Sequence, residues 1–539
     1  MSLFDANGKF RPAGEAGEFR RRAVRSAGVT VGSQGLVFVV QMVSTVVLAR
    51  LLMPSDFGVV AMVTTFSLLI MSFGQNGYME AVIQRDDIDH FLASNLFWIN
   101  LGVGTVLAIG FASAGSLLAR VYGHPRVALV AVALSPTIFL SGSSVVHSAL
   151  LKRAQRFSVT SANDIVATVI SVAVSIVLAW ARWGCWALVA GIIARLLIQC
   201  IGAWNLSGWM PGLPRAVKGT GSVVWFATNV YGRYTLNYFA RNLDNLLVGW
   251  RFGSDSLGFY KKAYDLFLLP ANQLLTPVSE VVLSTLSRLD RDSIQYRRYF
   301  LNGLSILAFI GMGAGAGLTL MGKDIIRVLL GARWETAGRI FTLFGPGIGI
   351  MLIYHTHGLI HLSIGRADRW LRWVIVEFSV TALLFLVGMH WGPVGVAAAW
   401  TLSFWILTLP GFWYAGRPIH FGIAPIIAVV WRYALASLTA ACVCAAIVRQ
   451  MPQLAGSSVF GALTRIAAIS SLFAALYLGA VVLFHGGPEP LFRFARLLPD
   501  LMPWGRSAKS SGQLEASVAS LKNSQTEPLP VPEGPGVCS

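Results

Sequence analysis

Charge is scarce in this chain, because only 12% of its 539 residues are Asp, Glu, Lys or Arg. An ordinary soluble protein carries about 25% charged residues. Apolar stretches of about 20 residues, the length that crosses a bilayer, recur along the whole sequence, and the mean hydropathy is +0.65. This composition excludes a set of soluble domains and predicts an integral membrane protein.

Cysteine is also scarce, with five in the chain and no CxxC pair. The sequence therefore predicts neither a disulfide framework nor a zinc site. His355, His357 and His361 resemble a metal cluster, but His355 points away from the other two in a helix, and no Cys or carboxylate lies at ligand spacing. A GxxxxGK[ST] phosphate loop is missing too, which excludes ATP as the direct energy source. We expect no metal and no cofactor.

Long apolar stretches predict an all-α membrane protein with about 14 transmembrane helices. The stretches at 222–250 and 259–283 are the least apolar of them. The predicted spans are 28–50, 57–75, 95–119, 126–148, 163–181, 184–206, 222–250, 259–283, 300–321, 339–362, 370–389, 392–414, 424–448 and 464–485.

Lysine and arginine gather in alternate loops, which marks the cytoplasmic side of a multi-pass membrane protein. Because the number of spans is even, both termini are expected in the cytoplasm. The net charge of +18 would also suit a nucleic-acid-binding protein, but attraction of juxtamembrane cations to anionic lipids accounts for it. We expect a basic N-terminus at 1–27 and a cytoplasmic tail at 486–539 that is disordered from about residue 505.

Three motifs recur at equivalent loops, which indicates an internal repeat. The two halves are related by offsets of 200, 213 and 208 residues. The pairs are DFGVVAM (56–62) with SLGFYKKAY (256–264), RAQRF (153–157) with RADRW (366–370), and WGCWALVA (183–190) with WGPVGVAA (391–398).

The repeat divides the chain into lobes. Since six spans are an even number, the second copy enters the membrane from the same side as the first, which gives parallel repeats around an axis along the membrane normal. The predicted parts are an N-lobe at 28–206, a linker at 207–221, a C-lobe at 222–416 and two extra spans at 424–485. Two similar halves with only short loops favour an alternating-access transporter over a membrane-embedded glycosyltransferase or polymerase.

The seventh span is polar along one face. At about 100° per residue, Arg233, Arg241 and Asp244 fall in one wedge with Asn229, Asn237 and Asn245. A lipid-facing arginine costs about 2.5–3.5 kcal/mol at the bilayer centre, so this face must turn to protein or water. One interpretation is an internal Arg241–Asp244 pair at i, i+3. The other is a surplus positive charge that binds a phosphate-bearing anion.

Two further ionisable residues lie inside predicted spans. Arg195 on the sixth span would add to the positive charge of the seventh. Glu377 lies in the middle of the eleventh span with no obvious partner in the sequence, and a carboxyl group in that position can carry a proton. The alternative for Glu377 is a hydrogen-bonded structural residue.

Several motifs resemble the polysaccharide-transport family, which includes the Wzx-type O-antigen flippases and the colanic-acid and succinoglycan exporters. They are ARLLMPSDFGVVAM (49–62), ALLKRAQRF (149–157), GCWALVAG (184–191), NYFARNLDNLLVG (237–249), LGFYKKAYDLFLLP (257–270) and LLGARW (329–334). The resemblance implies two six-helix lobes plus two helices, the fold of the multidrug/oligosaccharidyl-lipid/polysaccharide superfamily. One departure is Gly358-Leu359, where the family has Gly-Trp.

The resemblance also implies a function. Such a protein flips polyprenyl-pyrophosphate-linked oligosaccharide across the bacterial inner membrane for lipopolysaccharide or exopolysaccharide synthesis, with a polymerase and glycosyltransferases as expected partner enzymes. Residues that match the family's span-seven motif are Tyr238, Arg241, Asn242 and Asp244. The substrate-binding residues we predict are Arg195, Arg233, Asn237, Tyr238, Arg241 and Asn242, with Asp244 and Glu377 as groups for H⁺ or Na⁺ coupling. The alternative is a multidrug or cation antiporter of the same superfamily.

Overall fold

The structure is a computed structural model that describes residues 4–5, 10, 16–73, 79–84, 88–215, 220–289, 294–451 and 459–492. The side chains of residues 16–31 and of several residues within helices, among them Asn229 and Arg233, also lie outside this description. Contacts divide the chain into two units, Met1–Ala480 and Val481–Ser539. Helix α1 begins at Ala16, within the predicted basic N-terminus, but the side chains of residues 16–27 are not described. The whole stretch that we predict to be disordered lies outside the described residues, so both predictions stay predictions.

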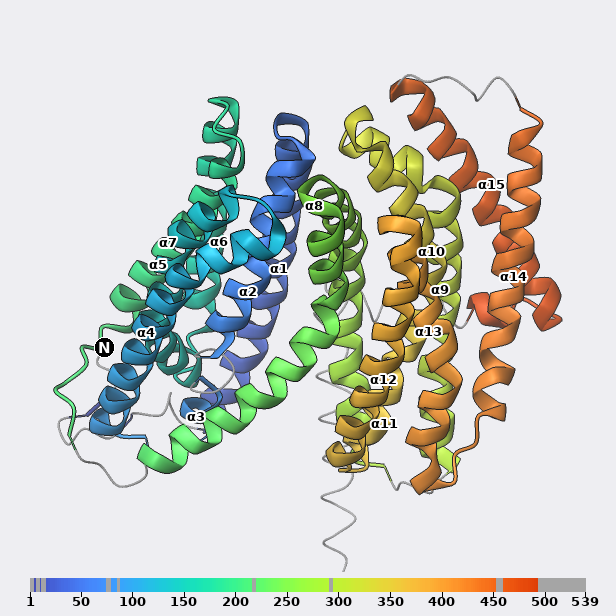
Figure 1. The fold of residues 1–539 in the computed structure, drawn as a ribbon. Helices are drawn as coiled ribbons and strands as arrows, with labels where there is room; N and C mark the ends of the chain where they lie inside the picture. The colour runs from blue at the N-terminus through green and yellow to red at the C-terminus, as the bar shows by residue number, and fades with distance from the viewer. Residues whose placement is uncertain are drawn as a thin grey trace, which may run out of the picture. The chain divides into compact units, whose positions relative to one another are not determined.

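The described residues are almost entirely helical (Figure 1). Phe4 and Phe10 form an isolated bridge, and Asp89 is another bridge residue, so the described residues contain no longer strand. The helices are α1 (Ala16–Leu51), α2 (Pro54–Phe73), α3 (Met79–Gln84), α4 (His90–Tyr122), α5 (Arg126–Arg153), α6 (Phe157–Trp180), α7 (Cys185–Ser207), α8 (Thr220–Leu286), α9 (Ile294–Leu329), α10 (Glu335–Tyr354), α11 (Thr356–Ser363), α12 (Ala367–Gly388), α13 (Gly392–Gly416), α14 (Ala424–Arg449) and α15 (Val459–His485).

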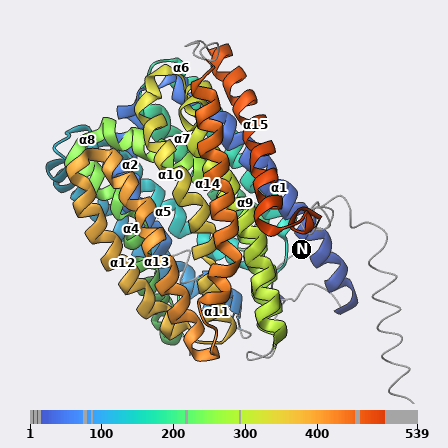
Figure 2. The same ribbon diagram turned by 90° about the vertical axis from the view of Figure 1, so that its right-hand side faces the viewer.

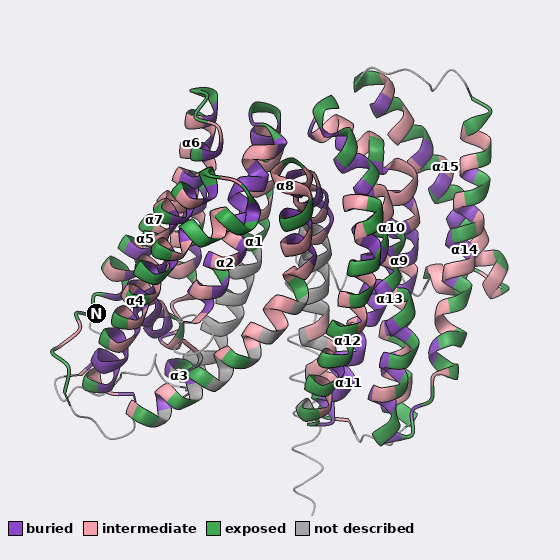
Figure 3. Ribbon diagram, viewed as in Figure 1, coloured by how far each residue is buried: buried purple, intermediate pink, exposed green. Residues whose placement is uncertain are grey.

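Eleven stretches of the described residues are long and apolar enough to cross a membrane. One of them, Asp368–Ile419, contains two helices, α12 and α13, that pack against each other. The polar helix α8 is not among the eleven. Exposed apolar side chains on the outer helix faces (Figure 3) suit a lipid environment. The predicted all-α membrane fold is therefore confirmed, and the number of fourteen spans stays a prediction.

Helix α8 is 67 residues long and bends at Gly253, whose φ of 79° and ψ of −173° are not helical. The bend separates the two least apolar predicted spans, 222–250 and 259–283. Before and after it, α8 packs against helices of both halves, chiefly α2, α10 and α13. In Figure 1 it lies between α1–α7 on one side and α9–α13 on the other.

The two halves touch through a reciprocal contact near the starts of α2 and of the second segment of α8. A Cβ atom on Gly58 would lie 1.8 Å from the backbone oxygen of Ser254, and one on Gly258 would lie 1.9 Å from the backbone oxygen of Pro54. With the offset of 200 residues, Pro54 corresponds to Ser254 and Gly58 to Gly258. Each half therefore contributes the same two positions, as at the interface of a two-fold dimer, which supports the predicted repeat.

Further contacts join the halves at the same end of the helices. Arg50 donates hydrogen bonds to the carbonyl oxygens of Val328 at 2.6 Å and Leu329 at 3.3 Å. Trp334 donates from Nε1 to the carbonyl oxygen of Ala49 at 2.8 Å and is fully buried. In the predicted topology this end faces out of the cell, so the described helices are closed at that end.

Turn geometry corrects one register in the repeat. Gln155 and Gly365 both have positive φ, 53° and 70°. In each turn the next residue donates its N–H five residues back, from Arg156 to Leu151 and from Arg366 to His361. Arg156 therefore corresponds to Arg366 at an offset of 210 residues. The offset of 213 residues that the sequence predicts was wrong. It aligns Arg153 with Arg366 because the letters of the two motifs match, but a short motif does not reveal the turn geometry that sets the register.

Helix α9 carries glycines on two faces. Gly311 and Gly315 bring its backbone against Gly345 and Gly349 of α10, where a Cβ atom would lie within about 3 Å of backbone oxygens. The other face receives α15, whose Tyr477 donates to the carbonyl oxygen of Phe309 at 2.7 Å. Figure 2 shows α9 beside both α14 and α15. Small residues allow such close helix packing in a membrane, where burial gives little driving force.

The predicted linker is tied to α4 over its first part. Asn95 donates to the carbonyl oxygen of Arg215 at 2.5 Å and accepts its N–H at 2.9 Å. Trp98 donates from Nε1 to the carbonyl oxygen of Gly212, and the hydroxyl of Ser94 accepts the N–H of Gly212. Trp209 is 5% exposed and donates to Nδ1 of His90 at 3.0 Å. These bonds fix the chain just before α8 begins.

Candidate functional site

The polar residues of the seventh span lie on the first segment of α8, before the bend at Gly253. Asp244 and Asn245 are buried, Asn237 and Asn242 are half-buried, and Arg241 is exposed. The side chain of Arg233 lies outside the described residues, so its predicted role stays a prediction. The described part of the predicted site is thus centred on Arg241.

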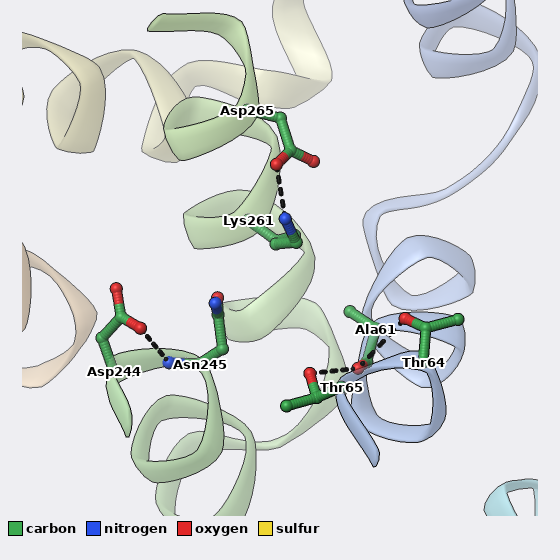
Figure 4. A network of polar contacts seen from close by, with 7 residues as sticks. All are labelled: Ala61, Thr64, Thr65, Asp244, Asn245, Lys261 and Asp265. Carbon is green, nitrogen blue, oxygen red and sulfur yellow. Dashed lines mark hydrogen bonds and ion pairs between the residues drawn. The ribbon is translucent and has the colours of Figure 1, made fainter. Parts of the chain in front are cut away.

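Asp244 is held by neutral donors. Its carboxylate, 1% exposed, accepts the N–H of Asn245 at 2.8 Å (Figure 4) and the hydroxyl of Tyr260 at 2.9 Å. Tyr260 is fully buried and lies beyond the bend of α8. Within the described part of the chain no ion pair joins Asp244 to Arg241. The internal-pair interpretation therefore does not describe this structure.

Arg241 keeps its donors available. Among the described residues its guanidinium makes no hydrogen bond and no ion pair. Its charge acts on Tyr264, His355 and Glu377, which belong to the second segment of α8, the α10–α11 junction and α12. The exposed side chain is therefore within electrostatic reach of these helices, and the carboxyl group of Glu377 is among the groups that it acts on. No ion pair of the described residues neutralises it.

Glu377 has a partner that the sequence did not reveal. Its carboxyl group shares a hydrogen bond with the hydroxyl of Tyr354, and Trp373 donates to the same hydroxyl at 2.8 Å. Tyr354 is 1% exposed and ends α10. The structure thus places the half-buried Glu377 beside two buried polar side chains and within electrostatic reach of Arg241, which suits either predicted role, structural or coupling.

Tyr238 attaches α8 to α2. Its hydroxyl donates to the carbonyl oxygen of Thr65 at 2.7 Å, and Tyr231 donates to that of Leu69 at 3.3 Å. Asn242 donates to the carbonyl oxygen of Tyr238 at 3.0 Å in its own helix. These contacts place one face of the polar stretch against α2. The predicted binding roles of Tyr238 and Asn242 stay predictions, and in this structure both side chains are already engaged.

Arg195 lies apart from Arg241. It is half-buried on α7, which packs against α2, α5 and α6. No contact of the described residues joins it to Arg241, so its predicted part in the site stays a prediction.

Three residues of the site escaped sequence reasoning. Tyr260 holds Asp244, and Lys261 pairs with Asp265 one turn further along α8 (Figure 4). All three belong to the motif LGFYKKAYDLFLLP (257–270). Because this motif is repeated and follows the polar span, it could have pointed to these residues as part of the site. Beside them the amide oxygen of Asn245 is buried without a partner. The described residues hold no group of three or more metal-ligand side chains.

Comparisons with known proteins bear on the whole arrangement. A family model described as "Polysaccharide biosynthesis protein" matches residues 47–338. The succinoglycan biosynthesis transport protein ExoT of Rhizobium meliloti is 21% identical over 73% of this chain and 79% of its own length. The lipopolysaccharide biosynthesis protein WzxC of Escherichia coli is 19% identical over 74% and 82%.

Two solved structures share the fold. The lipid II flippase MurJ in an inward closed conformation has a TM-score of 0.67 at 17% identity, covering 84% of this chain and 98% of its own. An inward-facing multidrug resistance transporter of the MATE family has a TM-score of 0.58 at 14% identity, covering 72% and 94%. At such identities the likeness concerns the fold alone, and it confirms the fold that the motifs implied.

Proposed function

The chain belongs to the polysaccharide biosynthesis protein family, and from that premise we propose that it is a flippase for polyprenyl-pyrophosphate-linked oligosaccharide in the bacterial inner membrane. A relative named as a succinoglycan biosynthesis transport protein and another named as a lipopolysaccharide biosynthesis protein support this class of substrate. The flipped units would serve surface polysaccharide synthesis. Both termini would lie in the cytoplasm.

The observation that carries the proposal is that the guanidinium of Arg241 makes no hydrogen bond and no ion pair with the described residues. An arginine without an ion-pair partner inside a membrane protein is costly unless a cavity or a ligand receives it. Guanidinium binds phosphate oxygens in bidentate geometry. The lipid-linked substrate carries such oxygens at the junction between sugar and lipid. Arg241 would therefore hold the diphosphate, together with Arg233 and the amides of Asn237 and Asn242.

The closed end fits one stage of transport. Arg50, Trp334 and the Gly58–Gly258 contact join the halves at the end that the predicted topology places outside. The substrate would enter from the cytoplasmic leaflet with its lipid remaining in the bilayer, and rocking of the halves would then expose it outward. Asp244 and Glu377 are the proposed groups for coupling to H⁺ or Na⁺.

Replacement of Arg241 by Gln tests the proposal. A charge-assisted hydrogen bond contributes about 1.5–3 kcal/mol, so we expect polysaccharide export to fall roughly 10- to 100-fold. The assay is complementation of a deletion strain, measuring surface polysaccharide and lipid-linked repeat units on the cytoplasmic side. Arg251→Gln, an exposed arginine on the same helix, is the matched control. Normal export by the Arg241→Gln protein at wild-type abundance would overturn the proposal.

A further inference from the structure

Helix α10 ends at Tyr354 and α11 begins at Thr356, both inside the candidate span Ala332–Ser363. His355 between them keeps helical φ and ψ of −59° and −21°, so this junction is a local interruption of the helix and not an unwound segment. The residues that follow the junction carry buried polar atoms.

Two buried histidines follow the junction. His357 and His361 are 3% and 0% exposed, with ring centroids 6.0 Å apart. Nδ1 of His357 lies 2.6 Å from the carbonyl oxygen of Tyr354. A carbonyl can only accept, so this nitrogen carries the proton, and Nε2 of the neutral ring is an acceptor. That Nε2 and both ring nitrogens of His361 have no partner among the described residues.

Arg369 of α12 completes the group. Its guanidinium stacks on the ring of Tyr414 at 4.1 Å and donates to the carbonyl oxygen of that residue at 2.8 Å. Its charge acts on His361. The Nε–H of Arg369 is buried, and in the described part of the protein nothing accepts it. Four nitrogen atoms from three side chains are therefore buried together without protein partners.

The four atoms divide evenly between donors and acceptors. Arg369 offers Nε–H and neutral His361 offers one N–H, while the other nitrogen of His361 and Nε2 of His357 accept. Because the two ring nitrogens of His361 point in different directions, more than one water is needed, and waters, which both donate and accept, can satisfy this set. An anion has no donor for the two acceptors, and a metal cation would meet the positive charge of Arg369. Buried polar atoms in proteins are normally satisfied by protein or by ordered water.

We propose that His357, His361 and Arg369 bind ordered water in a hydrated chamber beside the α10–α11 junction. The rings of Trp373, Tyr414 and Phe412 lie about it, 5.7–6.4 Å from the two imidazoles. Helices α8, α10, α12 and α13 pack against α11 there. The chamber adjoins the Arg241 site, since Trp373 donates to the hydroxyl of Tyr354, but its existence does not depend on the proposed substrate.

X-ray radiolytic footprinting of the full chain in nanodiscs detects such water, because radicals formed from bound water oxidise the side chains that touch it. We expect oxidation of His361 and Trp373, although both are buried. Trp334, fully buried in the apolar core, is the internal control and should stay unmodified. Equal protection of His361, Trp373 and Trp334 would overturn the proposal. So would a stoichiometric transition metal in the purified protein, measured by elemental analysis.

A substitution separates a hydrated chamber from a dry one. If the site were dry, His361→Leu would remove two unsatisfied polar atoms and leave the melting temperature unchanged or raised. With water bound, the same change deprives the water and Arg369 of partners, so we expect the melting temperature to fall by roughly 2 °C or more. His390→Leu, at an exposed position, is the matched control for the chemical change. A rise in melting temperature for His361→Leu alone would overturn the proposal.

Discussion

Asp244 is a buried carboxylate that forms no ion pair with the described residues. Its carboxylate accepts one backbone N–H and the hydroxyl of Tyr260, and it is 1% exposed. Hydrogen bonds to a charged group contribute about 1.5–3 kcal/mol, roughly twice those between neutral groups. Because Tyr260 takes this role, Arg241 is left to interact with something other than Asp244.

Removal of one hydroxyl tests the support of Asp244. Tyr260→Phe leaves a buried carboxylate short of a donor, so the free energy of unfolding should fall by about 1.5–3 kcal/mol. Tyr238→Phe is the matched change, since its hydroxyl donates to a neutral carbonyl, and it should cost about 0.5–1.5 kcal/mol. Thermal unfolding of both variants in detergent measures the difference. An equal or smaller loss for Tyr260→Phe would contradict a charged Asp244.

Sequence reasoning reached these residues unevenly. The polar wedge on α8 was visible because helical periodicity places Arg241, Asp244 and the asparagines on one side. The partners were not visible, since Tyr260 lies beyond a bend and Tyr354 belongs to another helix than Glu377. Helical periodicity predicts on which side of its own helix a side chain lies. It does not predict which residues of other helices, or of the same helix beyond a bend, pack against that side.

At the scale of elements, glycine decides which helices meet. Gly58 and Gly258 let α2 and the second segment of α8 touch through their backbones, and α9 uses two glycine faces for α10 and α15. The repeated motifs, at an offset of 200 residues, predicted that Gly58 and Gly258 are equivalent positions. The register at Arg156 and Arg366 was missed, because it is set by the left-handed residues Gln155 and Gly365 rather than by matching letters.

Adding one methyl group tests the reciprocal contact. In Gly58→Ala or Gly258→Ala the new Cβ atom would lie under 2 Å from a backbone oxygen of the other half. Overpacking of this kind costs about 1–3 kcal/mol, so each change should destabilise the state that is closed at this end. Increased thiol labelling of cysteines placed along the seam would report the opening.

Two comparisons serve as controls for the labelling experiment. Gly58→Ala and Gly258→Ala should have similar effects, since the contact is reciprocal. Gly102→Ala on α4, where a Cβ atom meets nothing within 4 Å, should be neutral or slightly stabilising. Unchanged labelling in both seam variants would show that the backbones do not approach so closely.

At the scale of the whole molecule, hydropathy and the alternation of basic loops led to the membrane class and the all-α fold. Most predicted spans coincide with helices, since a stretch of about 20 apolar residues has few other structures available in lipid. Helix α8 covers two predicted spans but is too polar to be among the eleven apolar stretches. A helix that lines a binding site in a membrane protein carries such polar side chains.

Thiol labelling tests the predicted topology. Trp183 and Trp391 are exposed at equivalent turns of the repeat. The half-buried Arg156 and the exposed Arg366 also occupy equivalent turns, directly before α6 and α12. In a cysteine-free background, Trp183→Cys and Trp391→Cys should react with an impermeant reagent added to spheroplasts. Cysteines at 156 and 366 should react only after permeabilisation. Opposite sides for the two members of a pair would mean inverted rather than parallel repeats.

The reciprocal contact around Gly58 and Gly258 is what a gene duplication would produce. A six-helix protein that met its own copy across a symmetry axis would supply both sides of such an interface from one glycine codon. Fusion of two copies into a single chain would then let the two codons change independently. Since a Cβ atom on either glycine would lie 1.8 or 1.9 Å from a backbone oxygen, the crossing point requires the smallest residue on each side.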